Sequence, residues 1–349
     1  MRIIQDPIGE PGWASLLERH PAASIFHSPG WLSALQKTYG YEPFVVTTSE
    51  GPALENGLVA CRVKGWMSRR LVSVPFSDHC AVLVDRPSEL SGILERLTTE
   101  ARTGGWKSVE LRPPDTDGTD CGLAATGVPL ERAAQYCLHR LDLRPELDEI
   151  FHRFHPSNTQ RAVRKAEREG LTYEAGRSDR LLNDFYRLLR MTRRRHGLPP
   201  QPFAWFRNLV ACLGDRVTIH EASKDGRAIA SVMTLSFKKT IVYKYGGSDA
   251  KYHRLGGMAS LFWQVIQQGR AAGIEELDLG RSDLDQPGLI AFKDHLGATR
   301  STLTYYRYPA PHSHGQHADW MPRLARGVMS HLPNAALDVA GRLLYKHLG

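Results

Sequence analysis

Hydrophobic and polar positions near the start of the chain alternate between stretches with the helical period and stretches with the two-residue period of strands. Strands are predicted over 44–48, 58–64 and 70–74, and short helices over 13–19 and 29–39. A hairpin turn is expected near Glu55-Asn56-Gly57. The pattern indicates a mostly antiparallel opening sheet.

A longer amphipathic helix follows over 87–104, with Ser88 as the expected N-cap and Gly104-Gly105 as the stop. A strand over 108–112 comes next, and strand-like alternation returns over 135–143 after a loop rich in Pro, Asp and Gly. A new helical stretch begins at Pro145, so we place a domain boundary there.

The second part repeats the alternation of helices and strands. Helices are predicted over 147–170 with an interruption near Pro156, over 179–196, 203–213 and 256–272; strands over 171–175, 217–222, 228–237, 240–246, 276–280 and 301–308. Turns at Asp225-Gly226 and Lys238-Lys239 join three of these strands into a meander.

One helix–glycine–strand pattern occurs in both parts, at 101–112 and at 270–281. We predict an α/β (α+β) fold in which one plan occurs twice, although α/β proteins show such echoes without duplication. The expected domains are 1–145 and 146–311, followed by a basic amphipathic tail over 312–349.

Composition narrows the class of protein. A length of 349 residues exceeds what one core usually supports, and 42% hydrophobic with 23% charged residues is ordinary globular composition. No apolar stretch approaches the roughly 20 residues that span a bilayer, and the N-terminus lacks a signal-peptide pattern. Five scattered cysteines predict neither a disulfide framework nor a zinc site. We expect a cytoplasmic protein, and its net charge of +8 favours an anionic partner.

The segment that joins the 240–246 strand to the 256–272 helix contains Arg254-x-x-Gly257-x-Ala259, in which Gly256 is the residue before Gly257. This spacing matches the signature of the GNAT acyltransferase superfamily, in which small residues let backbone amides at a helix start approach the pyrophosphate of coenzyme A. Glycines at a helix start are equally common for packing or capping alone. We list Arg254, Gly256, Gly257 and Ala259 as candidate donor-binding residues.

Four further segments carry a resemblance to a known family. They are Phe26-His-Ser-Pro-Gly-Trp31, Val74-Pro-Phe-Ser-Asp-His79, His155-Pro-Ser-Asn-Thr-Gln-Arg161, and the run from Gly280 to Ala298 with its Gly-x-Ser, Gly-Leu, Phe-Lys and Gly-Ala elements. Together they resemble the Fem-type aminoacyltransferases of peptidoglycan bridges and their BioF-like acetyltransferase-domain relatives.

The resemblance implies two GNAT-like domains with a cleft between them, and transfer of an activated acyl or aminoacyl group to an amine. Classical members use aminoacyl-tRNA as donor and a muramyl-pentapeptide precursor as acceptor. This chain lacks the coiled-coil insertion that some members use for tRNA, so acyl-CoA stays open as a donor. A sugar amine stays open as an acceptor, and no tightly bound cofactor is expected.

Lys293, in the Phe-Lys element, matches the family's lysine and is the candidate cation for a phosphate or a developing oxyanion. Arg281 is a candidate substrate-binding residue. Asp78, beside His79, and Asp283 each follow a strand and are candidate general bases. The alternatives are a solvated lysine on a helix and aspartates that anchor turns.

Arg161, Arg164 and Lys165 lie at helical spacing, so one helix face presents them to a diphosphate or a tRNA backbone. A denser group, Arg190 and Arg193 to Arg195, is secondary, because basic residues at a helix end also complement the dipole. A solvated helix face is the alternative for both groups.

The tail carries His312, His314 and His317 without a carboxylate or cysteine framework, so no metal site is predicted. Its segments 321–330 and 337–348 are amphipathic and basic, suited to docking on the body or to an anionic membrane surface. Two functions compete with envelope acyl transfer: coenzyme-A-dependent N-acetylation, and non-catalytic binding of tRNA or a nucleotide sugar.

Overall fold

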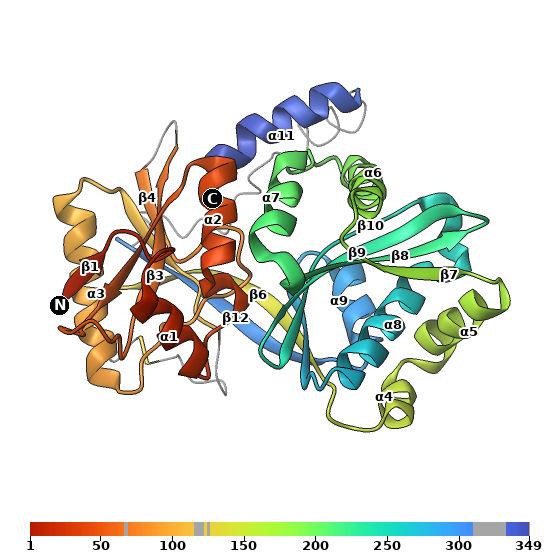
Figure 1. Cartoon of the computed structure of the whole chain (residues 1–349), viewed down its shortest axis with the longest axis horizontal. Helices are drawn as coiled ribbons and strands as arrows, with labels where there is room; N and C mark the ends of the chain where they lie inside the picture. The colour runs from red at the N-terminus through yellow and green to blue at the C-terminus, as the bar shows by residue number, and fades with distance from the viewer. Residues whose placement is uncertain (66–68, 115–121, 124–125, 310–332, 349) are drawn as a thin grey trace. The chain divides into compact units, whose positions relative to one another are not determined.

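The computed structural model describes the chain except residues 66–68, 115–121, 124–125, 310–332 and 349 (Figure 1). The fold consists of two compact units. Unit 1 contains residues 1–136, 301–320 and 342–349, and unit 2 contains 137–300 and 321–341. Their architecture is the predicted mix of helices with largely antiparallel sheet.

Unit 1 is built on a strand run in the order β1-β2-β3-β4-β5-β12. The bounds are β1 (Arg2–Ile4), β2 (Glu42–Thr47), β3 (Leu58–Lys64), β4 (Arg69–Val72), β5 (Ser108–Leu111) and β12 (Thr299–Tyr308). The pairs are antiparallel except β4 with β5, which are parallel. Because parallel neighbours require a crossover, the chain between β4 and β5 contains the long helix α3 (Pro87–Thr103).

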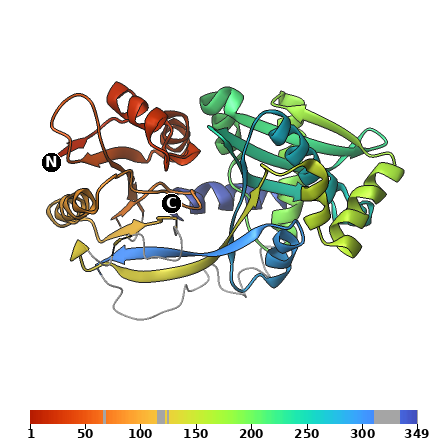
Figure 2. The same cartoon turned by 90° about the horizontal axis from the view of Figure 1, so that it is seen from below.

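Helices cover both faces of this sheet (Figures 1 and 2). The apolar stripe of α3, with Leu90, Ile93, Leu94 and Leu97, packs in one core cluster with strand residues such as Phe44 and Val109. The remaining helical segments of the opening are α1 (Pro11–Arg19), η1 (Ile25–His27) and α2 (Pro29–Tyr39).

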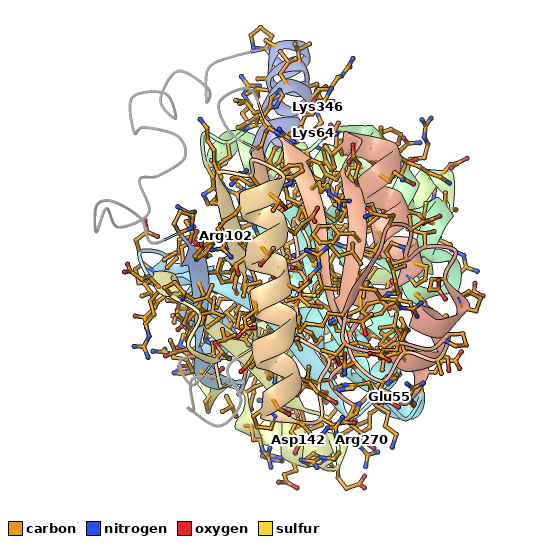
Figure 3. The ribbon with its side chains drawn as sticks, turned by 90° about the vertical axis from the view of Figure 1, so that its left-hand side faces the viewer. Glu55, Lys64, Arg102, Asp142, Arg270 and Lys346 are labelled. Carbon is orange, nitrogen blue, oxygen red and sulfur yellow. The ribbon has the colours of Figure 1, made fainter. Side chains whose placement is uncertain are left out.

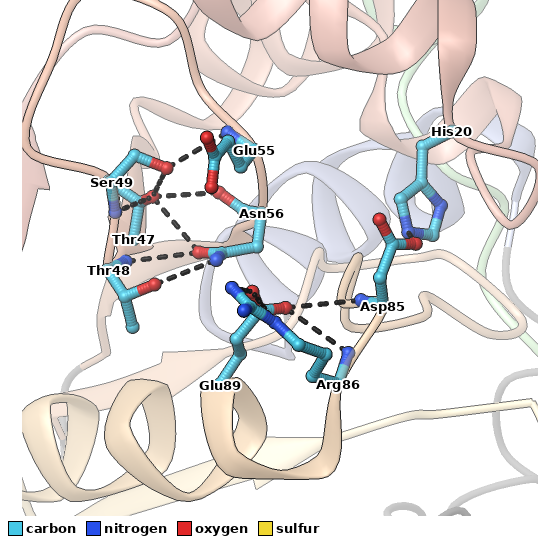
Figure 4. Close-up of polar contacts among 9 residues, drawn as sticks. All are labelled: His20, Thr47, Thr48, Ser49, Glu55, Asn56, Asp85, Arg86 and Glu89. Carbon is cyan, nitrogen blue, oxygen red and sulfur yellow. Dashed lines mark hydrogen bonds and ion pairs between the residues drawn. The ribbon is translucent and has the colours of Figure 1, made fainter.

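The start of α3 differs from the prediction. Arg86, not Ser88, is the N-cap residue, and Ser88 lies within the first helical turn. The Glu89 carboxylate accepts hydrogen bonds from the backbone N–H groups of Asp85 (3.2 Å) and Arg86 (3.3 Å), as Figure 4 shows. The reciprocal acidic residue of a capping box, which sequence reasoning overlooked, satisfies the donors at this helix start.

Unit 2 has strands in the order β11-β10-β9-β8-β7, and the 137–142 part of β6 (Glu131–Asp142) lies beside β11. The other bounds are β7 (Thr172–Gly176), β8 (Val217–Lys224), β9 (Arg227–Phe237), β10 (Thr240–Ser248) and β11 (Glu276–Asp283). The predicted meander is confirmed, because β7, β8, β9 and β10 pair antiparallel in sequence order. Asp225, Gly226 and Lys238 adopt positive φ angles at its two turns.

The helices of unit 2 lie on both faces of this sheet (Figure 1). Their bounds are α4 (Leu147–Arg153), the π-turn η3 (Pro156–Gln160), α5 (Arg161–Arg168), α6 (Asp179–Arg195), α7 (Phe203–Leu213), η4 (Gly214–Arg216), η5 (Ala250–Leu255), α8 (Gly257–Ala271) and α9 (Pro287–Asp294). The predicted interruption near Pro156 is confirmed as the π-turn between α4 and α5. Leu261, Phe262 and Val265 of α8 lie in a hydrophobic core cluster of this unit.

The compact units are discontinuous in sequence, whereas the predicted ranges 1–145, 146–311 and 312–349 are contiguous. The difference arises because β12 pairs with β5, which returns residues 301–308 to unit 1. The tail contains α11 (Asn334–Leu348), and the segments 312–317 and 321–330 lie outside the described residues. Among the described helices, none combines the length and apolar character needed to cross a bilayer.

Candidate functional site

The two parallel strands of unit 2, β10 and β11, separate soon after they meet. Their registered pairs are Thr240 with Glu276, Ile241 with Leu277 and Val242 with Asp278, and the described residues contain no later pair between them. β10 continues to Ser248 along β9, with a register shift between Tyr243 and Tyr245, and β11 continues to Asp283. The parallel register of β10 with β11 therefore ends at Val242, and beyond it β10 is paired with β9.

The chain that leaves β10 runs through η5 directly into α8. Gly256 caps this helix with φ 79°, and Gly257 and Ala259 are buried in its first turn. A Cβ atom on Gly256 would collide with the Ala162 carbonyl oxygen of α5. Gly256 is thus required both for its left-handed conformation and for the close approach of α5.

This close approach brings together two groups that the sequence predicted separately. Arg254 is exposed on η5, and Arg161, next to Ala162, is exposed at the start of α5. Arg164 is also exposed and lies over the Phe151 ring at 5.4 Å. Lys165 is half-buried on the same helix. Since the N-terminus of α8 carries a partial positive charge, this region of unit 2 is electrostatically suited to an anion.

The C-terminal end of α6 reaches the same strand end. Thr192 Oγ1 accepts a hydrogen bond from the Ser248 backbone N–H (2.9 Å), and the Ser248 hydroxyl lies 2.9 Å from His253 Nε2. Burial lowers the pKa of His253, and the charge of Arg195 lowers it further. A neutral His253 at physiological pH leaves the positive charge of this end to the arginines.

Lys293 is the most buried of the candidate catalytic residues. Its side chain is 2% exposed, and Nζ donates to the carbonyl oxygens of Gly280 (2.8 Å) and Arg281 (3.1 Å) of β11. Gly280 has φ 70°, and its N–H donates to Asp278 Oδ1 at 2.7 Å. The lysine therefore holds the part of β11 that lies beyond the last pair with β10.

The two candidate aspartates lie in different units. Asp283 is the last residue of β11, and its carboxylate accepts a hydrogen bond from Gln286 Nε2 at 2.9 Å, just before α9. Asp78 is half-buried in unit 1, where its backbone carbonyl accepts a hydrogen bond from the Tyr305 hydroxyl at 2.7 Å. Only Asp283 belongs to the same unit as Lys293 and Arg254.

An ionic network in unit 1 was not identified from the sequence. Glu110 Oε1 accepts from Arg112 Nη2 (2.7 Å), and Glu110 Oε2 accepts from Arg307 Nη2 (3.2 Å). Burial raises the pKa of Glu110, but Arg112, Arg307 and Arg70 outweigh it and hold that pKa at about 2. Arg112 also donates to the carbonyl oxygens of Val74 and Ser77, both at 3.3 Å. The one available signal was alternation of charged residues with apolar residues in β5.

A second polar contact, between a buried histidine and a partly exposed aspartate of unit 2, was also missed. His139 on β6 is fully buried, and its Nε2 lies 3.1 Å from Asp294 Oδ1 at the end of α9. Burial lowers the pKa of His139. Partial burial raises the pKa of Asp294, but hydrogen bonds from Arg300 and His139 outweigh it and lower that pKa. The pair fixes the end of the helix that carries Lys293.

Comparisons with known proteins agree with this geometry. Residues 153–293, which include β10, β11, α8 and Lys293, match the family described as acetyltransferase (GNAT) domain. A curated relative, the UDP-N-acetylmuramoylpentapeptide-lysine N(6)-alanyltransferase of Weissella viridescens, is 25% identical over 130 residues. That match covers 37% of this chain and 37% of the relative.

Two solved structures share the fold. FemX superposes with a TM-score of 0.71 at 14% identity, over 88% of this chain and 97% of FemX. The C-terminal domain of a putative lysylphosphatidylglycerol synthetase from Agrobacterium fabrum gives a TM-score of 0.57 at 15% identity, over 87% of this chain and 92% of that domain. The resemblance to Fem-type and GNAT proteins that the motifs indicated is confirmed, as is the predicted fold class.

Proposed function

We propose that this chain is an acyltransferase whose activated acyl or aminoacyl donor binds in unit 2, where β10 and β11 separate in front of α8. The observation that carries the proposal is the short parallel register of β10 with β11, which ends at Val242 and Asp278 and is followed along the chain by the glycine-capped start of α8. The GNAT-domain match over residues 153–293 covers this region and supports the assignment.

The donor end of the site needs two kinds of contact. Phosphate groups of coenzyme A or of a tRNA terminus are placed at the start of α8, where Arg254, Arg161, Arg164 and Lys165 supply positive charge and Gly256, Gly257 and Ala259 keep the backbone accessible. The extended part of the donor lies along β10 beyond Val242, as an added strand would.

The transfer step needs a neutral amine, a proton acceptor and a stabilised oxyanion. Arg281 and Asp283, at the far end of β11, are our candidates for substrate binding and for the base, with Asp78 as a further candidate. Lys293 is assigned to this end of the site, where it positions Gly280 and Arg281 through its two hydrogen bonds. Loss of transfer in a folded Lys293 variant would support this role.

We further propose that the acceptor amine belongs to a cell-envelope precursor, either a peptidoglycan precursor or a polysaccharide, and that the reaction takes place in the cytoplasm. The support is the activity for which the Weissella viridescens relative is named, alanyl transfer to a muramoylpentapeptide lysine, and the fold shared with FemX. Acyl-CoA or aminoacyl-tRNA would serve as a co-substrate.

One observation favours a second function, acetyl-CoA-dependent N-acetylation. Arg254, Gly257 and Ala259 match the GNAT spacing and lie at the start of α8, where a pyrophosphate would meet the backbone amides. The two functions differ in donor and share the site.

Thermal unfolding of the purified chain with acetyl-CoA, bulk aminoacyl-tRNA and UDP-muramyl-pentapeptide separates these functions. A ligand that binds only the folded state increases the free energy of unfolding, by about 2.7 kcal/mol at a concentration 100 times its Kd, and therefore raises the Tm. Stabilisation by tRNA and the muramyl precursor supports aminoacyl transfer, and stabilisation by acetyl-CoA supports acetylation. No shift with any donor would contradict the proposed donor site and favour a different acceptor or a binding role.

A further inference from the structure

The C-terminal helix α11 exposes a face that its own packing leaves uncovered. Leu337, Gly341 and Tyr345 are buried on one side of the helix. Val339 and Leu343 are 52% and 55% exposed, which places them among the most exposed large apolar side chains of the described residues. Aliphatic side chains one turn apart on an exposed helix face indicate a contact that lies outside the chain.

Two cations share that face. Arg342 and Lys346 are exposed, and Lys346 is labelled on α11 in Figure 3. At about 100° per residue, these two cations and the two aliphatic residues fall within an arc of roughly 100°. Positive charge beside exposed aliphatic residues is the pattern of helices that lie in the plane of an anionic lipid surface.

The acidic residue of the helix does not oppose this charge. Asp338 points toward α6 in unit 2, where its carboxylate pairs with Arg190 Nε at 3.3 Å and accepts from the Tyr186 hydroxyl at 3.4 Å. A Cβ atom on Gly341 would collide with the Pro200 carbonyl oxygen, so the helix backbone lies directly on the loop before α7. These contacts fix which face of α11 is turned outward.

The neighbouring surface of α6 adds further positive charge. Arg187, Arg190 and Arg194 line a shallow depression together with Met191, which is 36% exposed. Arg190 is also the partner of Asp338, so the depression lies next to the 334–341 part of α11, which belongs to unit 2. Arginines around a shallow depression suit the phosphate of a lipid headgroup.

We propose that the exposed face of α11, formed by Val339, Arg342, Leu343 and Lys346, binds the surface of an anionic phospholipid bilayer. The two aliphatic side chains enter the interface, and the cations contact headgroup phosphates. With only two apolar anchors, the attachment is reversible. This inference is independent of the proposed transfer reaction, since lipid binding is measured without turnover.

Vesicle flotation of the full chain tests the proposal. We expect binding to vesicles of equal parts phosphatidylcholine and phosphatidylglycerol, weaker binding at high salt, and little binding to phosphatidylcholine alone. The double variants V339S/L343S and R342Q/K346Q should each bind the mixed vesicles at least about 10-fold more weakly than the parent chain. Each variant must keep the parental Tm, because all four side chains face outward.

Matched substitutions elsewhere control for non-specific hydrophobic binding to vesicles and for the change in net charge. Leu284→Ser removes an apolar side chain that is 61% exposed, and R207Q/K251Q removes two exposed cations of unit 2. Both controls should float like the parent chain. The proposal would be overturned by equal losses in the controls or by absence of binding to mixed vesicles. It would also be overturned by concentration-dependent dimers that V339S/L343S abolishes, because the face would then be a self-association surface.

Discussion

The two parallel strand pairs, β4 with β5 in unit 1 and β10 with β11 in unit 2, begin alike and end differently. Each pair has three registered residue pairs, and each is joined by a helix that crosses back to the sheet. In unit 2, β10 and β11 then separate. In unit 1, the chain after β4 stays on β5, because the Ser73 N–H donates to the Glu110 carbonyl at 2.8 Å.

The hydrogen bonding that keeps the chain on β5 in unit 1 extends over the loop after β4. The Arg112 N–H donates to Ser73 Oγ (2.8 Å), and the Cys80 N–H donates to the Arg112 carbonyl (2.6 Å). Val74 and Phe76 adopt positive φ angles to follow this path. In unit 1 the chain's own backbone and Arg112 thus lie at the position that corresponds to the proposed donor site of unit 2. If the proposal holds, one plan supplies a donor site or a scaffold, depending on the loop after the first parallel strand.

The largest expected effect on stability comes from removing Arg112, which holds the loop after β4 in unit 1. Arg112→Met leaves the Glu110 carboxylate buried without its main partner, which should cost about 3–5 kcal/mol of unfolding free energy. Urea denaturation measures this cost, and Arg102→Met, at an exposed position of α3, should be near neutral. Donor-induced stabilisation of the folded variant should persist, since the donor is assigned to unit 2. A loss below about 1 kcal/mol would show that the network does not hold unit 1 together.

In unit 2 the corresponding test is Lys293→Ala. The change removes a buried aliphatic stem and two hydrogen bonds to β11, for an expected cost of about 2–4 kcal/mol. Transfer activity of the folded fraction should fall at least about 10-fold, because Gly280 and Arg281 lose their support. Lys251→Ala, at an exposed position of η5, is the control. Full activity in folded Lys293→Ala would remove this lysine from the site.

Low pH should weaken both units, because each contains a deeply buried neutral histidine. Burial lowers the pKa of His27 in unit 1 and of His220 in unit 2 to about 4. The unfolded chain binds protons at these residues below about pH 6.5, so stability is complete above that pH and falls between about 6.5 and 4. Each histidine contributes about 1.4 kcal/mol per pH unit.

His27→Gln and His220→Gln should each flatten the pH dependence of the unfolding free energy by one such contribution. The hydrogen bonds of the neutral rings explain the expectation: His27 accepts from the Ser24 N–H (3.0 Å), and His220 Nε2 lies 2.8 Å from the Thr234 hydroxyl. Denaturation series at several pH values provide the measurement. An unchanged slope in both variants would show that these rings are not neutral in the folded chain.

The smallest effect is expected at the start of α8 in unit 2. Arg254→Ala removes an exposed cation at the start of α8 and should weaken donor binding by about 3- to 10-fold, with stability changed by less than about 0.5 kcal/mol. Titration of the donor identified by thermal unfolding provides the measurement, and Lys251→Ala on the same η5 turn removes the same charge as a control. If both variants bind alike, the contribution of Arg254 is only its charge at long range.

Local pattern was sufficient for most of the secondary structure. The strands β8, β9 and β10 lie within two residues of their predicted ends, because Asp225-Gly226 and Lys238-Lys239 are strong turn signals between apolar runs. The N-cap of α3 was misplaced because Ser88 outweighed the acidic Glu89 in the interpretation. The short edge strand β1 was missed, since three residues carry too little periodicity to be recognised.

The sequence indicated which residues are candidates for the site, but it did not predict how they are arranged in three dimensions. Spacing indicated Arg254 and Gly257, and resemblance indicated Lys293. The separation of β10 from β11, the approach of Ala162 to Gly256 and the burial of Lys293 all depend on contacts distant in sequence. The roles of the candidate residues stay predictions.

The burial of Lys293 also bears on chemical self-damage. A lysine side chain is itself an amine, the kind of acceptor on which activated acyl donors act. With Nζ donating to two carbonyl oxygens and only 2% of the side chain exposed, this amine is withheld from attack on the donor. A protein that handles reactive acyl groups can thereby keep a lysine beside them without becoming its own substrate.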